Sequence, residues 1–378
     1  MDDNDNTRGF ALAEFASVRS LFEANVANGL DLGASFSASV EGQTVIDLWG
    51  GWADAQRTRP WNEDTIVNLY SMAKTMTALC ALVLIDRGEL DPDAPVARYW
   101  PEFAANGKSK IKVRHLLSHT AGLPSWPAGM QMADLYDWNK ATGILAQQMP
   151  LWAAGTAWGY HANTQGFLVG EVVRRITGRT LGTFFREEIS TPLGADFHFS
   201  LPESEDARVA DLVVAESRRP MAFEFNELAL RIFTDPATDP ALTKTRAWRN
   251  AEMPAISCFG NARAITRVHS VLANGGVLDG KRILSEKGCR RALELEFAGA
   301  EILTGTQTRH GLGFYLLAGH HVVPGPNIVY GGVRGGSLVV IDFDARAVCS
   351  YAMNRMILGP HMRGMALTTA FWSALAGR

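Results

Sequence analysis

A serine and a lysine three positions apart, Ser71 and Lys74, begin one of the most apolar segments of the chain. Residues three apart share one face of a helix, so the Ser71 Oγ and Lys74 Nζ atoms are expected to lie within hydrogen-bond reach. The positive end of the helix dipole favours negative charge on the serine oxygen, and burial lowers the pKa of a lysine until it can accept a proton. The pair therefore predicts a serine nucleophile with a lysine as its base.

The same spacing occurs a second time, at Ser109 and Lys112 in the stretch GKSKIKV. This copy lies among lysines and no apolar helix follows it, so we interpret it as a solvent-exposed turn. The spacing alone is therefore not specific for a catalytic pair, and the sequence around Ser71 has to show whether Ser71 and Lys74 are catalytic.

The elements around Ser71 can be predicted from composition and periodicity. The segment that follows the serine has the length and composition of a helix over 72–88, which Gly88 ends. Before it, we expect a helix over 15–29 and, over 34–54, a hairpin of two alternating strands. Ser71 is thus placed between a strand region and a buried helix.

The middle and the last third of the chain differ in character. Between about 89 and 250 the sequence predicts helices and long loops, such as helices over 164–178 and 180–189, and no strong strand. The last third predicts short strands over 310–318, 327–332, 335–343 and 347–355, and a closing helix over 364–377.

Strands at both ends of the chain with helices between them predict an α/β (α+β) fold with one antiparallel sheet, flanked by terminal helices and carrying an inserted helical domain. We expect residues 1–70 and 250–378 to form the α/β domain and residues 71–249 the mainly helical one. The active site is expected at the interface between them.

Composition limits the kinds of partner. The 378 residues are 47% hydrophobic, with a net charge of -3, which gives no field to attract nucleic acid or an anionic membrane. We therefore expect a small-molecule substrate. The sequence does not indicate the oligomeric state. The acidic start of the chain lacks a signal-peptide pattern and no apolar run is long enough to span a bilayer, so we expect a cytoplasmic protein.

No cofactor and no metal are expected. The chain has no P-loop, no dinucleotide-binding fingerprint and no G-x-S-x-G elbow. His115 and His119 are four apart but lack the glutamate of a zincin, and we interpret them as structural. The cysteines form no CxxC pair and are expected to be reduced core thiols: Cys80, Cys258, Cys289 and Cys349.

Four stretches together resemble the serine β-lactamase and penicillin-binding-protein superfamily, in the class C-like branch that includes the family VIII carboxylesterases. They are SMAKTMTALCALVLIDRGELDPDAPVARYWPEF, KVRHLLSHTAGLPSW, AGTAWGYHANTQGFLVGEVVRRITG and YGGVRGGSLVVIDF, which follow one another in the family's order across roughly residues 35–355. The resemblance implies a β-lactamase/transpeptidase-like fold.

The resemblance also implies roles for individual residues. Ser71 matches the acylated nucleophile, Lys74 its activating base, and Tyr160 in WGYHAN the tyrosine that shuttles the proton. The family's commoner motif is Tyr-x-Asn, whereas here Ala162 stands in the third position and Asn163 comes one place late.

The family's Lys-Thr-Gly element is absent. In its place stands Tyr330-Gly331-Gly332-Val333, which is similar to the Trp-Gly-Gly of family VIII esterases. The resemblance implies that the Val333 N–H forms an oxyanion hole with the N–H of Ser71. Further candidates for substrate contact are Tyr330, Gly331, Gly332, Arg334, His161 and Trp158, although His161 and Trp158 could instead pack and Arg334 could be an exposed edge charge.

Together these features predict a serine hydrolase that cleaves carboxylic esters of small molecules through an acyl-enzyme intermediate. Three alternatives stay open: a β-lactamase or D-amino-acid peptidase on the same site, an acyltransferase on the same site, and a scaffold without activity. The presence of Ser71, Lys74 and Tyr160 together disfavours the scaffold.

Overall fold

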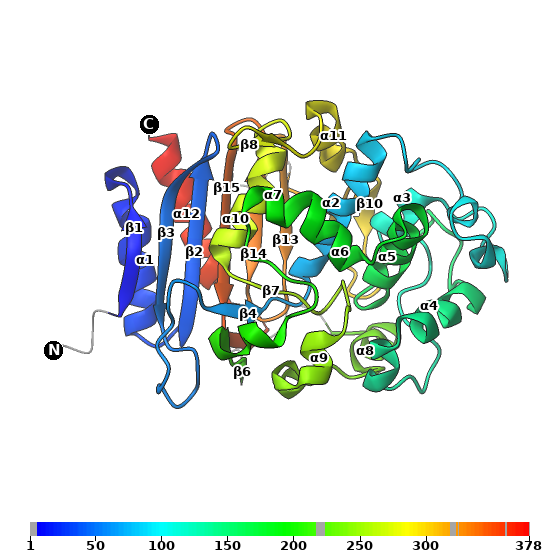
Figure 1. The fold of residues 1–378 in the computed structure, drawn as a ribbon, viewed down its shortest axis with the longest axis horizontal. Helices are drawn as coiled ribbons and strands as arrows, with labels where there is room; N and C mark the ends of the chain where they lie inside the picture. Colours follow the sequence, from blue (N-terminus) through cyan, green and yellow to red (C-terminus); the bar gives the residue numbers. More distant parts are fainter. Residues whose placement is uncertain (1–5, 217–223, 318–322, 324, 360, 378) are drawn as a thin grey trace.

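The computed structural model describes residues 6–216, 224–317, 323, 325–359 and 361–377 (Figure 1). Its centre is a nine-stranded sheet in which every neighbouring pair is antiparallel. The strand order is β1 (Thr7–Ala11), β3 (Gln43–Gly51), β2 (Gly33–Val40), β15 (Ala347–Met353), β14 (Leu338–Asp342), β13 (Ile328–Gly332), β12 (Tyr315–Leu316), β11 (Gln307–His310) and β10 (Phe297–Ala300).

The two ends of the chain meet inside this sheet. Strand β2 from the first fifty residues pairs with β15, with Val40 opposite Ala347 and Ala34 opposite Met353. The predicted hairpin, β2 and β3, turns at Glu41 and Gly42, both of which have positive φ. The antiparallel sheet assembled from both termini is therefore confirmed.

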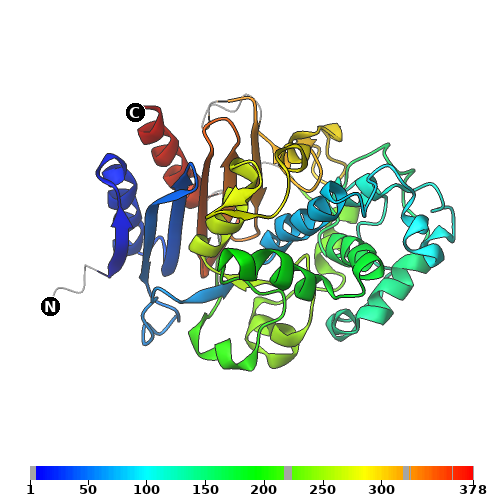
Figure 2. The same ribbon diagram turned by 45° about the horizontal axis from the view of Figure 1, so that its top comes forward.

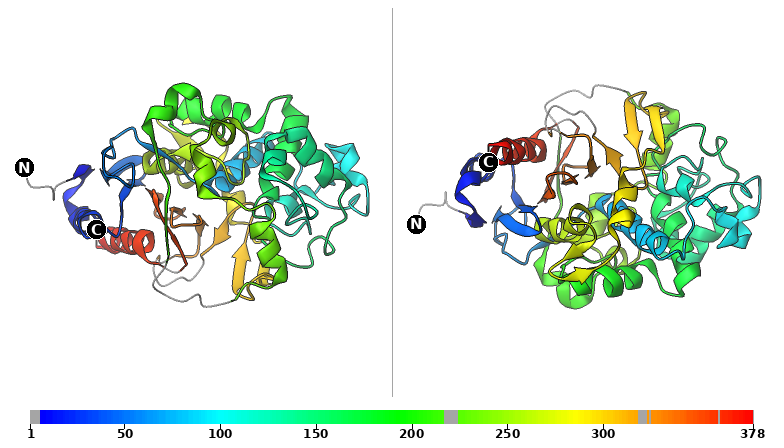
Figure 3. Two further views of the ribbon diagram at one scale, coloured as in Figure 1. Left: turned by 90° about the horizontal axis from the view of Figure 1, so that it is seen from below. Right: turned by 90° about the horizontal axis from the view of Figure 1, so that it is seen from above.

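Helices cover both faces of the sheet. Helices α1 (Ala16–Ala27) and α12 (Arg363–Ala376) lie together on one face, where the rings of Phe15 and Phe371 are 5.3 Å apart (Figure 3). Helix α10 (Ala262–Ala273) lies on the other, where the Thr266 hydroxyl donates to the Ser37 carbonyl at 3.0 Å.

Helix α2 (Met72–Asp86) runs through the interior and is buried from Met72 to Ile85. Its residues lack proline and glycine and are mostly apolar, which is typical of a helix surrounded by protein. It packs against α5 (Thr164–Thr177), which ends at Gly178 with a left-handed φ of 69°. The remaining helices surround this pair (Figure 2): α3 (Val113–Leu117), α4 (Trp138–Gln147), α6 (Leu181–Phe185) with its π-helical continuation Arg186–Ser190, α7 (Thr191–Leu193), α8 (Glu227–Thr234), α9 (Arg246–Asn250) and α11 (Glu286–Arg290).

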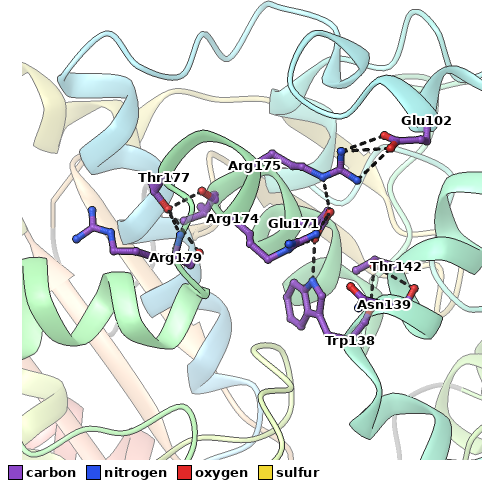
Figure 4. Close-up of polar contacts among 10 residues, drawn as sticks. Glu102, Trp138, Asn139, Thr142, Glu171, Arg174, Arg175, Thr177 and Arg179 are labelled. Carbon is purple, nitrogen blue, oxygen red and sulfur yellow. Dashed lines mark hydrogen bonds and ion pairs between the residues drawn. The ribbon is translucent and has the colours of Figure 1, made fainter.

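A buried carboxylate fixes α5 against its neighbours. Glu171 of α5 accepts hydrogen bonds from the Trp138 indole at 2.7 Å, from Arg174 at 2.8 Å and from Arg175 at 2.6 Å (Figure 4). Burial alone would raise the pKa of Glu171, but these donors outweigh it and hold that pKa below its usual value. Arg175 extends the network to Glu102, so the network ties α4 and α5 to the loop that follows α2.

Three expectations about strands were wrong or incomplete. The described part of the region 89–250 contains two short strands, β5 (Val209–Ala210) and β6 (Val213–Glu216). Strand β5 pairs in parallel with β4 (Ile66–Asn68), and β6 pairs in parallel with β16 (Arg355–Leu358). Strands this short carry no alternation that a sequence pattern could show. Further short strands are β7 (Phe259–Gly260), β8 (Val277–Leu278) and β9 (Lys281–Arg282).

The sheet also extends further at its edges than the sequence predicts. Strands β1, β10 and β11 were not anticipated, because β1 and β10 are partly exposed edge strands without a clear apolar alternation. The strand predicted over 310–318 is divided, since Gly313 adopts a φ of 88° between β11 and β12. Ala318 lies outside the described residues.

The domain division stays a proposal. We propose, from the position of the sheet and of the helices, that residues 1–70 and 250–378 form one unit and 71–249 the other. None of the helices in the described ranges is both long and apolar enough to cross a membrane.

Candidate active site

Ser71 stands at the start of α2, where a strained residue presents it. Tyr70 has a φ of 42°, the left-handed region that bulky residues avoid. Ser71 itself is the N-cap of the helix, but its hydroxyl makes no capping bond. The side chain is therefore free for chemistry at the positive end of the helix dipole.

Lys74 lies one helical turn further on and is only 5% exposed. Its Nζ is 3.1 Å from Ser71 Oγ and 2.8 Å from the carbonyl oxygen of Ala255. Burial lowers the pKa of Lys74 to about 7 and outweighs the Cys258 thiol, which acts in the opposite direction. A substantial fraction of Lys74 is therefore neutral near pH 7 and able to accept a proton.

Tyr160 approaches the same oxygen from the loop before α5. Its hydroxyl donates to Ser71 Oγ at 2.9 Å, and the Lys74 Nζ lies 4.8 Å from the centre of its ring. Burial raises the pKa of Tyr160 to about 12, so the phenol keeps its proton at neutral pH. The three residues singled out in the sequence converge on one atom.

Two histidines hold the Tyr160 loop in place. The backbone N–H of His161 donates to His119 Nδ1 at 3.1 Å, and the Nε2 of His161 accepts from the N–H of Leu123 at 3.0 Å. The Nδ1 of His161 bonds to the Gly159 carbonyl at 2.6 Å. Both ring nitrogens of His161 are therefore used by the backbone, and burial lowers its pKa to about 4.

The structure places the candidate contact residues His161 and Trp158 among packed groups. His161 is fully buried, and Trp158, almost fully buried, stacks on the Tyr160 ring with centroids 6.2 Å apart. Neither lines the cavity beside Ser71. Both support Tyr160 from outside the cavity.

Strand β13 passes close to α2 beside Ser71. A Cβ on Gly331 would come within 2.6 Å of Thr75 Cγ2, so only glycine permits this approach. Tyr330 stacks on Tyr315 with ring centroids 4.9 Å apart. Neither Tyr330 nor Gly331 lines the cavity, contrary to expectation, whereas Gly332 does.

The N–H of Val333, the expected oxyanion donor, is engaged within the protein. The N–H of Val333 already donates to the Ser337 carbonyl at 2.9 Å, as part of the turn between β13 and β14. The N–H groups of successive residues in an antiparallel strand point alternately to its two sides. The N–H of Gly332 therefore points away from β14, and β12 ends too early to pair with it.

A cavity of about 750 Å³ opens beside Ser71. Its walls come from segments far apart in the sequence, and Arg334 is the only Lys, Arg, Asp or Glu among the described residues that line it. The lining residues are Tyr70, Ser71, Tyr160, Ala162, Asn163, Phe225, Phe233, Thr238, Ile256, Tyr315, Gly332, Val333, Arg334, Gly335, Ile357, Leu358, Gly359 and His361.

Sequence reasoning missed most of this wall. Tyr70 precedes the nucleophile and could have been suspected from that position alone. Phe233, Ile256, Tyr315 and Ile357 carry no local signal, because only the tertiary fold brings them beside Ser71.

Of the remaining candidates, only Asn163 lies at the cavity. Lys112 forms an exposed ion pair with Asp93 at 3.1 Å, as expected of a surface turn. Asn163 lines the cavity but makes no side-chain hydrogen bond within the described part of the chain. His115 accepts a hydrogen bond from the Lys112 N–H through Nδ1. The described residues contain no group of three or more His, Cys, Asp or Glu side chains that could hold a metal.

Comparison with known proteins places this geometry in a family. The family model described as Beta-lactamase matches residues 18–370. The esterase/beta-lactamase LipL of Mycobacterium tuberculosis (strain ATCC 25618 / H37Rv) is 33% identical over 340 residues, covering 86% of this chain and 77% of that protein.

Two solved structures are similar along their whole length. A family VIII carboxylesterase has a TM-score of 0.91 at 41% identity, covering 97% of this chain and 99% of the other. A penicillin-binding-protein homologue from Caulobacter crescentus has a TM-score of 0.87 at 35% identity, covering 98% and 100%. With its antiparallel sheet and its serine, lysine and tyrosine meeting at the start of α2, the structure has the β-lactamase-like architecture. The chain belongs to the beta-lactamase family, as its sequence motifs predicted.

Proposed function

We propose that this protein is a serine carboxylesterase of the β-lactamase fold, acting on small-molecule esters. The convergence of Lys74 Nζ and the Tyr160 hydroxyl on Ser71 Oγ, at 3.1 and 2.9 Å, carries the proposal. The similarity to a family VIII carboxylesterase over nearly the whole chain supports it.

Acylation begins when Ser71 Oγ attacks the ester carbonyl carbon. The hydroxyl proton of Ser71 passes to neutral Lys74, whose pKa of about 7 suits it to act as a base. Tyr160, which holds its proton, donates to the oxygen of the departing alcohol and recovers a proton from the Lys74 ammonium. The alcohol leaves, and the acyl group stays on Ser71.

Two backbone donors stabilise the negative charge on the carbonyl oxygen. The N–H of Ser71 makes no backbone hydrogen bond to another described residue, and the N–H of Gly332 points to the open edge of β13. We assign the oxyanion hole to these two groups in place of Val333. Each such donor contributes about 10²- to 10³-fold to the rate of acyl transfer in other enzymes.

Deacylation repeats the same steps with water as the nucleophile. Lys74 takes a proton from the water as the water oxygen adds to the acyl carbon. The bond from that carbon to Ser71 Oγ then breaks, Tyr160 gives its proton to Ser71 Oγ and recovers one from the Lys74 ammonium, and the free acid leaves. No step requires a metal or a cofactor. We keep a cytoplasmic location as a proposal that rests on the sequence pattern alone.

A β-lactamase activity is the second candidate, because the relative LipL is described as an esterase/beta-lactamase. An acyltransferase would use the same acyl-enzyme with an alcohol in place of water. Hydrolysis of p-nitrophenyl butyrate, measured with and without a primary alcohol, tests the proposal. We expect butyrate as the main product; release of p-nitrophenol only when alcohol is present would establish an acyltransferase instead.

A further inference from the structure

The cavity beside Ser71 is mostly apolar, yet one part of it carries an unpaired positive charge. Arg334, in the turn after β13, forms no ion pair with any residue in the described ranges. Its one hydrogen bond to a described residue goes from Nη1 to the Thr238 hydroxyl at 3.3 Å. An arginine has five N–H donors in a planar fork, so most of its hydrogen-bonding capacity stays open.

A second polar group in the same wall also lacks a partner. Tyr70 lines the cavity and is only 4% exposed, but its hydroxyl makes no hydrogen bond within the described structure. A buried polar group without a partner costs free energy and calls for an explanation, such as a ligand. The Arg334 guanidinium is close enough to Tyr70 to lower the pKa of its phenol, against the larger effect of burial.

The surroundings of these two groups favour an anion over a cation. His361, which also lines the cavity, is held neutral because burial lowers its pKa to about 4. Among the described residues, Asp239 is the one carboxylate that raises the pKa of Tyr70, and its side chain already accepts a hydrogen bond from the Ala241 N–H at 2.9 Å.

We propose that Arg334 and Tyr70, with the Thr238 hydroxyl, form an anion subsite, and that the preferred substrates are esters that carry a carboxylate. This inference rests on the proposed esterase function and narrows its substrate class. A carboxylate accepts two parallel hydrogen bonds from a guanidinium and a third from a phenol, which fits the donors present. The apolar walls then hold the carbon chain between the carboxylate and the reacting carbonyl.

Binding of a simple carboxylate tests the subsite without turnover. Calorimetry on the Ser71→Ala variant compares the affinity for 4-phenylbutyrate with that for its neutral amide. The comparison is repeated on two double variants, Ser71→Ala with Arg334→Met and Ser71→Ala with Arg57→Met. Arg57 is exposed and lies outside the cavity, so its variant controls for the loss of one charge. We expect the carboxylate to bind about tenfold more tightly than the amide. This ratio is at the lower end of the range for a charge-assisted hydrogen bond, because Arg334 is exposed.

The same preference should appear in turnover. Two matched pairs place the charge on either side of the ester: 4-nitrophenyl hydrogen adipate against 4-nitrophenyl hexanoate, and 4-butyryloxybenzoate against its methyl ester. We expect at least one charged ester to have about tenfold higher kcat/KM than its neutral partner, and Arg334→Met alone to abolish this difference. Arg334→Lys should keep part of it.

The outcomes separate the two proposals. Equal binding of acid and amide, or a preference that survives Arg334→Met, overturns the anion subsite while leaving the esterase intact. Absence of ester hydrolysis overturns the esterase proposal, and the calorimetry on Ser71→Ala still measures the subsite.

Discussion

Lys74 Nζ lies 3.1 Å from Ser71 Oγ in a site where burial lowers the lysine pKa to about 7. Burial at the start of an apolar helix therefore allows Lys74 to be neutral near pH 7 and to act as a base. The predictions that follow depend on this relationship.

The first prediction concerns pH. Lys74 acts as a base only when it is neutral, so kcat/KM for p-nitrophenyl butyrate should fall as pH decreases through about 7. Tyr160, with a pKa of about 12, keeps its proton and adds no alkaline limb below about pH 10. A profile that is flat from pH 5 to pH 9 would exclude Lys74 as the titrating base.

The second prediction concerns Tyr160. Tyr160→Phe removes the donor to Ser71 Oγ and the acid for the leaving group, so kcat should fall by about two to four orders of magnitude. Folding should survive, because the ring keeps its contacts. Tyr136→Phe, outside the cavity, is the matched control and should keep parent activity. A Tyr160→Phe enzyme within a few-fold of the parent would require another proton donor.

The third prediction concerns the approach of β13 to α2. Gly331→Ala places a Cβ 2.6 Å from Thr75 Cγ2, which pushes the strand and its Gly332 N–H away from Ser71. We expect kcat to fall at least about tenfold, since small misplacements of catalytic groups are costly.

A second substitution tests the cause of that loss. Thr75→Ser removes the methyl group that clashes and keeps the hydroxyl that donates to the Met72 carbonyl at 2.9 Å. The double variant Gly331→Ala with Thr75→Ser should therefore recover activity and Tm. If Thr75→Ser gives no recovery, steric contact with Thr75 is not what requires glycine.

The fourth prediction is a preference for esters over β-lactams. The family's Lys-Thr-Gly lysine is replaced by Tyr330, which has no charge to hold a β-lactam carboxylate. Loss of that partner should weaken β-lactam binding by about 1.5–3 kcal/mol, or one to two decades. kcat/KM for p-nitrophenyl butyrate should thus exceed that for nitrocefin, and the remaining nitrocefin turnover should decrease in Arg334→Ala. Nitrocefin turnover equal to the ester would show that Tyr330 does not limit β-lactams.

The sequence was sufficient for the central strands of the sheet and for the meeting of Ser71 with Lys74, because their signals are local. Strand β2 alternates serine with apolar residues, and β3, β14 and β15 are short, mostly apolar segments bounded by turns. Ser71 and Lys74 share a helix turn that their spacing alone defines. The motif order then brought Tyr160 to the same site.

The site features that the sequence could not predict depend on tertiary packing or on the direction in which a backbone N–H points. The roles of His161 and Trp158 changed because both are buried behind Tyr160, which no local pattern shows. The Val333 N–H, expected in the oxyanion hole, donates instead to the Ser337 carbonyl. Only the register of β13 and β14 reveals this hydrogen bond.

The most direct test of the central claim is to identify the serine that carries the acyl group. A fluorophosphonate probe, followed by peptide mass spectrometry, should label Ser71 in the parent chain and in Ser109→Ala, which has the second copy of the spacing removed. Ser71→Ala should lose both the label and the hydrolysis of p-nitrophenyl butyrate. Labelling of another serine, with hydrolysis retained in Ser71→Ala, would contradict the account.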